Sequence, residues 1–77
     1  MRIKMTWPSA SNYGKEYEVD LLERCKSYYS SGHLMDDGIK VRFDNGWESF
    51  IEMWRIEIMQ TTPAERAMID NPVIRQW

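Results

Sequence analysis

The stretch GIKVRFDNGWESFIEMWRIEIM, residues 38–59, decides the fold of this chain. Within it, residues 39–43 alternate apolar and basic side chains, which is the pattern of a strand with one buried face. The tripeptide DNG at 44–46 then suits a type I turn closed by a glycine bulge. This turn sets four opposing pairs: Ile39 with Ile51, Val41 with Ser49, Phe43 with Trp47, and Arg42 with Glu48. The stretch therefore predicts an antiparallel hairpin.

Beyond Phe50 the pattern allows two structures. A helix gathers a narrow apolar stripe from Trp47, Phe50, Ile51, Trp54 and Ile58. A strand instead places Trp54, Ile56 and Ile58 on one side, with Arg55 and Glu57 on the other. The hairpin favours the strand, which we expect to run to about residue 59 with a bend or bulge near Glu52 and Met53.

The segment before the hairpin predicts a helix. In residues 16–31, EYEVDLLERCKSYYSS, a helix places six apolar side chains on one face: Tyr17, Leu21, Leu22, Cys25, Tyr28 and Tyr29. Gly32 then stands where a left-handed helix cap belongs. The first six residues also alternate as a strand does, but the wider periodicity favours an amphipathic helix.

The two ends of the chain carry further signals. Residues 2–7, RIKMTW, alternate as a strand does, and a small polar loop follows them. Residues 62–65, TPAE, form a helix start, because threonine caps the helix, proline suits its first position and glutamate completes a capping box. We expect this helix over about residues 63–70, with a last turn over 73–77.

Together these segments predict an α+β fold in one domain, residues 1–77. A three-to-four-stranded antiparallel sheet carries one amphipathic helix (about 16–31) and a short C-terminal helix (about 63–70). A chain of 77 residues buries roughly 60% of its unfolded surface, so its stability is small. Its four Trp, four Tyr and two Phe are large enough to fill a small core, and such residues also dominate binding hot spots.

Charge and cysteine content narrow the classes of function. Residues 1–43 carry seven basic and six acidic side chains, whereas residues 44–77 carry three and six. Without a clustered basic patch, direct nucleic-acid binding is disfavoured. Cys25 is the only cysteine, which excludes an internal disulfide and a cysteine-based zinc site and is typical of a reducing compartment. No apolar run suits a signal peptide or a membrane span, so we expect a soluble cytoplasmic protein, in the host cytoplasm if phage-encoded.

Catalytic and metal-binding patterns are absent from the sequence. His33 is the only histidine, and Cys25 lies on the apolar face of the expected helix. Asp36, Asp37 and Asp44 lack the spacing of a calcium loop, and the Asp-Gly and Asp-Asn-Gly steps are typical of turns. No glycine-rich phosphate loop is present either. We therefore expect no enzymatic activity, no cofactor and no metal site.

The segment IKVRFDNGW resembles the hairpin of small SH3-like barrels such as Tudor and chromo-barrel domains. In both, a V-x-F-x-x-G-W turn is followed by a run of acidic and aromatic residues. The resemblance implies strands where residues 16–31 predict a helix. It also implies an aromatic cage for methylated lysine, assembled from several strands.

Acidic residues with aromatic neighbours form the candidate partner-binding site. The set comprises Asp36, Asp37, Asp44, Glu48, Glu52 and Glu57, with Trp54 and Trp77 as aromatic anchors and Trp47 as a third. One interpretation is a solvated face that keeps a small protein in solution. The other is an anionic surface that meets a basic partner, with the tryptophans as hot spots.

These features favour a non-catalytic protein-binding module. The leading hypothesis is a small inhibitor from a phage or mobile element, similar in action to an anti-CRISPR or anti-restriction protein, that docks on a basic, nucleic-acid-handling host complex. Its partner is then a larger protein or nucleoprotein complex. Two alternatives remain open: a reader of nucleic acid or modified peptides built on the SH3-like hairpin, and a structural subunit that forms a homo-oligomer such as a homodimer.

Overall fold

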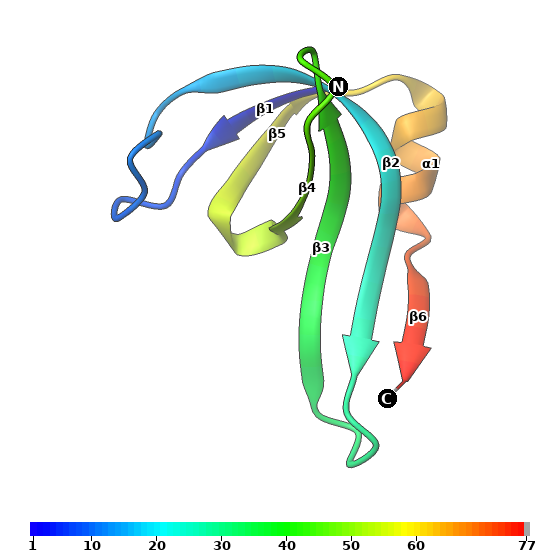
Figure 1. Cartoon of the computed structure of the whole chain (residues 1–77). Coiled ribbons are helices and arrows are strands. Elements are labelled where there is room, and N and C mark those ends of the chain that lie inside the picture. The colour runs from blue at the N-terminus through cyan, green and yellow to red at the C-terminus, as the bar shows by residue number, and fades with distance from the viewer. Residues whose placement is uncertain (77) are drawn as a thin grey trace.

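The computed structural model describes residues 1–76 and is mostly β-structure (Figure 1). In chain order its elements are β1 (Arg2–Met5), β2 (Glu16–Tyr28), β3 (Leu34–Phe43), β4 (Glu48–Glu52), the 3-10 turn η1 (Met53–Arg55), β5 (Ile56–Gln60), α1 (Pro63–Asp70) and β6 (Val73–Gln76). Strands account for 54% of the structure and only one α-helix is present among these residues. The α+β expectation of three to four strands and two helices is therefore wrong.

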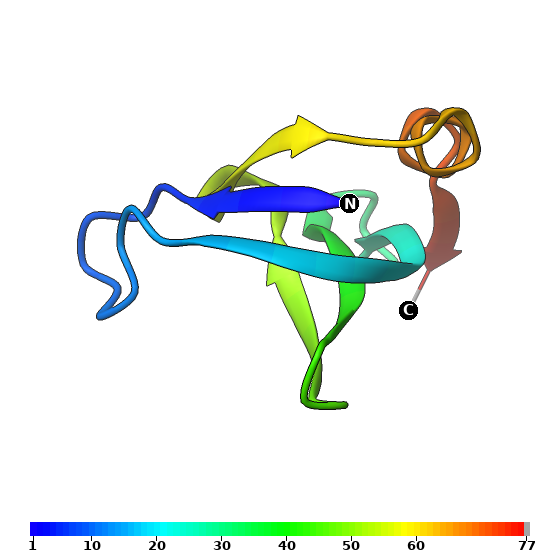
Figure 2. The same cartoon turned by 90° about the horizontal axis from the view of Figure 1, so that it is seen from above.

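Five strands follow one another in the order β4-β3-β2-β1-β5, each antiparallel to its neighbour. The sixth, β6, pairs with β2 in parallel. Strand β2 is long enough to pair with β1 near its start and with β6 near its end. Figure 1 shows β2 and β3 projecting together beyond the body, and Figure 2 shows β3 and β4 turned across the direction of β1 and β5. The sheet is thus folded over on itself, with β2 common to both parts.

The largest correction concerns residues 16–31, which form strand β2 and the start of a turn instead of the expected helix. Leu21 pairs with Val41, but the register then shifts, so that the next paired residue is Glu23. This bulge accommodates Leu22 beside Leu21 within one strand, and an adjacent apolar pair is what makes the sequence look helical. Gly32 does have a positive φ of 90°, but it lies in the tight turn between β2 and β3.

Two local predictions are confirmed. The hairpin has the expected register: Ile39 faces Ile51, Val41 faces Ser49, Arg42 faces Glu48, and the Phe43 N–H donates to the Trp47 carbonyl oxygen at 2.8 Å. Helix α1 begins with the expected reciprocal capping box, in which the Thr62 hydroxyl accepts from the Glu65 N–H and the Glu65 carboxylate accepts from the Thr62 N–H.

The segment after the hairpin is a strand with an interruption. The bend expected near Glu52 and Met53 is the 3-10 turn η1, and β5 continues the extended chain from Ile56. The last turn expected over 73–77 is wrong for its described part, because residues 73–76 form strand β6. No helix within residues 1–76 is long and apolar enough to cross a membrane.

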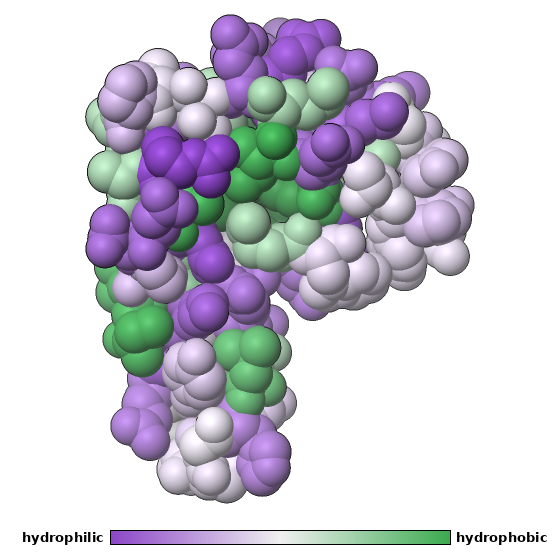
Figure 3. Space-filling view, turned by 180° about the vertical axis from the view of Figure 1, so that it is seen from behind, coloured by the Kyte–Doolittle hydropathy of each residue, from purple (hydrophilic) through white to green (hydrophobic). Residues whose placement is uncertain are grey.

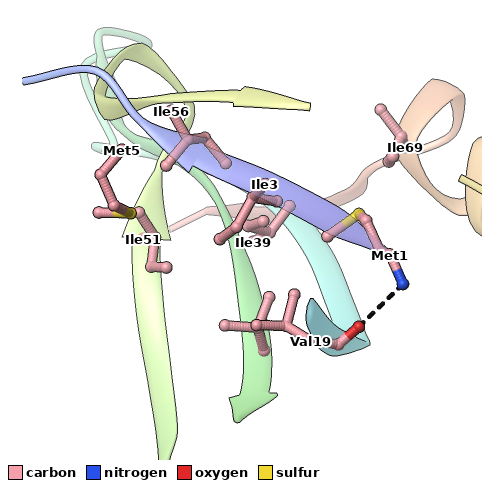
Figure 4. Packing of buried hydrophobic residues seen from close by; sticks show 9 residues of the cluster. Met1, Ile3, Met5, Val19, Ile39, Ile51, Ile56 and Ile69 are labelled. Atoms are coloured by element: carbon pink, nitrogen blue, oxygen red, sulfur yellow. Dashed lines mark hydrogen bonds between the residues drawn. The ribbon is translucent and has the colours of Figure 1, made fainter. Parts of the chain in front are cut away.

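The core lies between the two parts of the sheet. Ile3 from β1 and Ile39 and Val41 from β3 have no exposed surface. Figure 4 shows them packed together with the other members of the cluster, which are Met1, Met5, Val19, Ile51, Ile56 and Ile69. Burying an isoleucine completely contributes about 1.5–3 kcal/mol. Because these residues come from β1 to β5 and from α1, the core joins every described element except η1 and β6.

The SH3-like resemblance of the hairpin implies strands where residues 16–31 predict a helix, and β2 is a strand there. A meander of four strands is followed by a single 3-10 turn, after which β5 returns to pair with β1. The fold is therefore a five-stranded sheet folded over on itself, to which α1 and β6 are added at the C-terminal end.

Candidate functional site

A cleft of about 400 Å³ lies between the β1–β2 loop and strand β4. The loop contributes Trp7, Ala10 and Asn12; the hairpin and β4 contribute Phe43, Trp47, Ser49, Phe50, Ile51 and Glu52; Met5 and Arg55 complete the lining. Met5 and Ile51 are buried members of the core, so they form the floor. The cleft thus has a mixed lining, in which aromatic and aliphatic side chains alternate with polar groups such as Asn12, Glu52 and Arg55.

Aromatic side chains at the cleft are exposed to an unusual degree. The Trp47 side chain is 68% exposed and Phe50 is 43% exposed, although both are large enough to stabilise a core. The turn fixes Trp47, since its backbone N–H donates to the Asn45 side-chain oxygen at 2.9 Å. A small protein that leaves a tryptophan in water at a fixed position has the kind of surface that forms a binding hot spot.

Trp7, Trp54 and Arg55 form a compact group at one end of the cleft, which we term the Trp–Arg clamp. The two indole rings meet edge to face, with centroids 5.6 Å apart and planes at 76°. The guanidinium carbon of Arg55 lies 4.1 Å from the Trp7 ring centroid and 4.8 Å from that of Trp54. Both distances lie within the range of cation–π attraction.

Glu52 holds the clamp from the side of β4. Its carboxylate accepts a hydrogen bond from the Trp54 indole N–H and lies 3.7 Å from an Arg55 terminal nitrogen. The second distance is too long for a hydrogen bond, so Glu52 acts on Arg55 by charge alone. Glu52 therefore orients Trp54, and Trp54 in turn helps to hold Arg55.

The cleft also borders an open sheet edge. Among the described residues β4 pairs only with β3. In an antiparallel pair, alternate residues direct their backbone groups to the partner strand. Because Trp47 bonds to Phe43, the residues bonded to β3 are Trp47, Ser49 and Ile51. The backbone N–H and C=O of Phe50, a cleft residue, consequently point to the open edge.

Three of the six acidic residues predicted for a partner site, Asp37, Glu48 and Glu52, are engaged within the protein. Glu48 lies 3.0 Å from Arg42 and 3.6 Å from Lys40, and the hydrogen bond from Arg42 holds the pKa of Glu48 below its usual value. Asp37 forms an ion pair with the buried Arg24 at 2.5 Å. The charge that these carboxylates present to solvent is therefore partly neutralised.

The remaining predicted residues lie apart from one another. Asp44 is in the exposed hairpin turn, Asp36 is on the projecting part of β3, and Glu57 is on β5 opposite Lys4. The structure therefore brings together Glu52 and Trp54, with Glu48 farther along β4, but it does not gather the whole acidic series. Trp77 lies outside the described residues.

Three residues of the cleft were missed by sequence reasoning. Trp7 is read there only as the end of a strand, Phe50 only as part of a possible helical stripe, and Arg55 as the polar side of a strand. Trp7 and Arg55 belong to segments far apart in the chain, and only the return of β5 to β1 brings them together. A partial signal exists, because Trp7 precedes the Pro-Ser loop where a buried strand residue is least expected.

Cys25 and His33 are the described side chains of the types most often used in catalysis or metal binding. Among residues 1–76 no three His, Cys, Asp or Glu side chains are grouped so that they could hold a metal ion. Burial raises the pKa of the Cys25 thiol, so it stays protonated at neutral pH. His33 is exposed in the β2–β3 turn and contacts Ser31 at 3.1 Å.

Comparison of the chain with known proteins finds no matching family model, curated protein or solved structure.

Figure 3 shows the face opposite to the view of Figure 1. Hydrophobic side chains there gather over the upper body and in separate spots on the projecting part. The exposed apolar residues of the C-terminal end, Val73 and Ile74, belong to β6. They do not line the aromatic cleft.

Proposed function

We propose that this protein is a non-catalytic binding module that takes an extended peptide segment of another protein into the aromatic cleft. One observation carries the proposal: exposed Trp47 and the unpaired edge of β4 border the same hollow. The edge offers hydrogen bonds to a peptide backbone, and the hollow offers a place for its side chains.

Strand addition suits this geometry. A peptide aligned beside β4 exchanges backbone hydrogen bonds with Phe50, and alternate peptide side chains then face the cleft. Trp47 and Trp7 lie on opposite borders of the hollow, one on the hairpin and one on the β1–β2 loop. A large apolar peptide side chain between them loses its contact with water, which is the main source of affinity at such sites.

The cleft is a better candidate for the main contact than the acidic series. Glu48 and Asp37 are each paired with internal cations, whereas the Trp47 ring has most of its surface in water. Exposed ion pairs contribute little to affinity, but buried aromatic anchors contribute much. Inhibition of a basic, nucleic-acid-handling host complex stays a prediction from charge, and it is compatible with peptide capture by the cleft.

A peptide-display selection followed by NMR tests the proposal. A random library is selected on the protein and depleted on the variant Trp47→Ala, and enriched peptides are titrated into ¹⁵N-labelled protein. We expect the largest shifts at residues 7–12 and 47–52, and at least about tenfold weaker binding to the variant. Because Trp47 is exposed, this change leaves the core intact.

Tyr29→Ala is the matched control, since Tyr29 is also an exposed aromatic residue but lies just beyond the C-terminal end of β2, away from the cleft. We expect the Tyr29→Ala variant to bind the selected peptides with the wild-type affinity. The proposal fails if no peptide is enriched over the depleted pool, or if the shifted amides lie away from the cleft.

A further inference from the structure

We infer that Arg55 anchors an acidic side chain of the bound peptide, so that the cleft selects an Asp or Glu beside an apolar residue. This inference rests on the proposed function and adds to it the chemistry of the ligand. It depends on how the Trp–Arg clamp holds the guanidinium group.

The Arg55 guanidinium has donors that the described residues leave unused. Within residues 1–76 no hydrogen bond reaches it, and Glu52, its nearest carboxylate, is 3.7 Å away. Its Nε is buried without a hydrogen-bond partner. A buried unpaired donor is unfavourable, so stacking on the two indoles keeps this side chain in place against that cost. Such exceptions to full pairing concentrate at functional sites.

Stacking prepares the guanidinium for a carboxylate. The two indole rings restrict the position of the planar group, so less side-chain freedom is lost when a ligand binds. The Arg55 side chain is 35% exposed, so part of the group remains open to the cleft while the rest is shielded from water. A carboxylate accepts two parallel hydrogen bonds from a guanidinium in this state.

An anionic ligand group fits the clamp better than a cationic one. A cation seeking the same indole faces has to displace Arg55 from both rings. A carboxylate instead accepts hydrogen bonds from guanidinium donors that are already in place. Glu52 is not a full substitute, since one of its oxygens is bonded to the Trp54 indole and the other is beyond hydrogen-bond distance of Arg55.

The position of the clamp predicts a spacing in the peptide. Trp47 precedes β4 and Arg55 follows it, so the two groups lie at opposite ends of the cleft. Side chains on the same face of an extended peptide are two or four residues apart. We therefore expect an acidic residue at one end of the motif, and an apolar residue two or four positions away that contacts Trp47.

Matched peptides test the inference. A peptide from the display selection is synthesised with blocked ends and with either Glu or Gln at the acidic position, and a third form carries Gln with a free C-terminal carboxylate. Each is titrated calorimetrically into the wild-type protein and into Arg55→Gln, Arg55→Lys and Arg66→Gln. Arg66 is the control because it is an exposed arginine on α1 that pairs with Asp70.

We expect the wild-type protein to bind the Glu form about tenfold more tightly than the Gln form. Arg55→Gln removes this preference, Arg55→Lys retains part of it, and Arg66→Gln leaves it unchanged. Thermal unfolding of each variant verifies that it is folded. If Arg55→Gln is not folded, the comparison is made with Arg55→Lys instead.

Three results overturn the inference: equal affinity for the Glu and Gln forms, an undiminished preference in Arg55→Gln, or tightest binding of the form with the free C-terminal carboxylate. If the peptides still shift cleft amides in any of these cases, the proposed function stands while the inference falls. If display yields no peptide, N-acetylglutamate methylamide and its glutamine counterpart give the same comparison through the indole N–H signals of Trp7 and Trp54. Equal shifts then overturn the inference independently.

Discussion

Gly38 on β3 lies beneath the ring of Phe50 on β4. A Cβ atom at position 38 would be 2.6 Å from the Phe50 Cζ atom and 2.4 Å from the Ile51 carbonyl oxygen. Both distances are shorter than any real Cβ contact, and the second involves backbone that cannot rotate away. The close approach of the two strands at this point thus requires a residue without a side chain.

Gly38→Ala should lower the free energy of unfolding by about 1–3 kcal/mol, because β4 has to shift away from β3. Urea denaturation measures the loss, with Lys40→Ala as an exposed control on the same strand. Adding Phe50→Ala to Gly38→Ala should recover only part of the stability, because the Ile51 carbonyl remains in place. Full recovery in the double variant would show that the ring alone causes the clash.

Asp37→Asn should destabilise the projecting hairpin. Arg24 is only 8% exposed, and its terminal nitrogen contacts Asp37 as well as the Cys25 and Gly38 carbonyl oxygens. Removing the carboxylate leaves a buried guanidinium without its counter-charge, at a cost of about 2–3 kcal/mol once the partial exposure of Asp37 is considered. Thermal and urea unfolding measure this cost.

The neighbouring Asp36→Asn is the control for that change, because Asp36 has no ion pair within the described residues. The free energy of unfolding of Asp36→Asn should remain within about 0.5 kcal/mol of the wild-type value. Equal losses in the two variants would mean that general charge, and not the Arg24 pair, determines the stability of this hairpin.

Stability should depend on pH through the contact between the Met1 ammonium group and Glu65, which are 3.1 Å apart. Burial lowers the pKa of the Met1 ammonium, but hydrogen bonds to Glu65 and Glu18 outweigh this effect, so its pKa is raised above 8.0. The hydrogen bond from the Thr62 backbone, aided by the ammonium, lowers the pKa of Glu65 below 4.5. The two groups thus stabilise each other as an ion pair.

The signs of these shifts give two pH windows. Because the pKa of Glu65 is lower in the folded than in the unfolded state, its ionised carboxylate stabilises the fold. This contribution is complete above about pH 4.5 and is lost as pH falls through the folded pKa of Glu65. Because the pKa of the Met1 ammonium is higher in the folded than in the unfolded state, its charged form also stabilises the fold. This contribution is complete below about pH 8.0 and is lost as pH rises through the folded pKa of Met1. Glu65→Gln should reduce both losses in urea titrations from pH 3 to 10, whereas exposed Glu57→Gln should leave the alkaline loss unchanged.

How far sequence reasoning reaches depends on how local each signal is. The hairpin turn and the capping box of α1 lie within a few residues, and both are predicted correctly. The helix prediction for β2 is wrong because the bulge near Leu22 depends on how β2 pairs with β3. No local sequence pattern encodes that pairing. The site shows the same division. Glu52 and Trp54 are two residues apart in the sequence and are among the predicted site residues, whereas Trp7 and Arg55 meet only through the pairing of β1 with β5.

Strand β6 should be the least stable part of the sheet. All four of its side chains are exposed, so its parallel pairing with residues 25–28 of β2 is held by backbone hydrogen bonds and one ion pair, between Arg75 and Glu23. Parallel pairing is slightly weaker per residue than antiparallel pairing, and a strand that buries no side chain gains little from the hydrophobic effect. Hydrogen exchange followed by NMR should show the bonded amides of 73–76 exchanging at least about tenfold faster than those of Ile39 and Val41. Arg75→Gln should increase the difference by removing the ion pair, and equal protection of β6 and β3 would instead mean that β6 opens only when the whole domain unfolds.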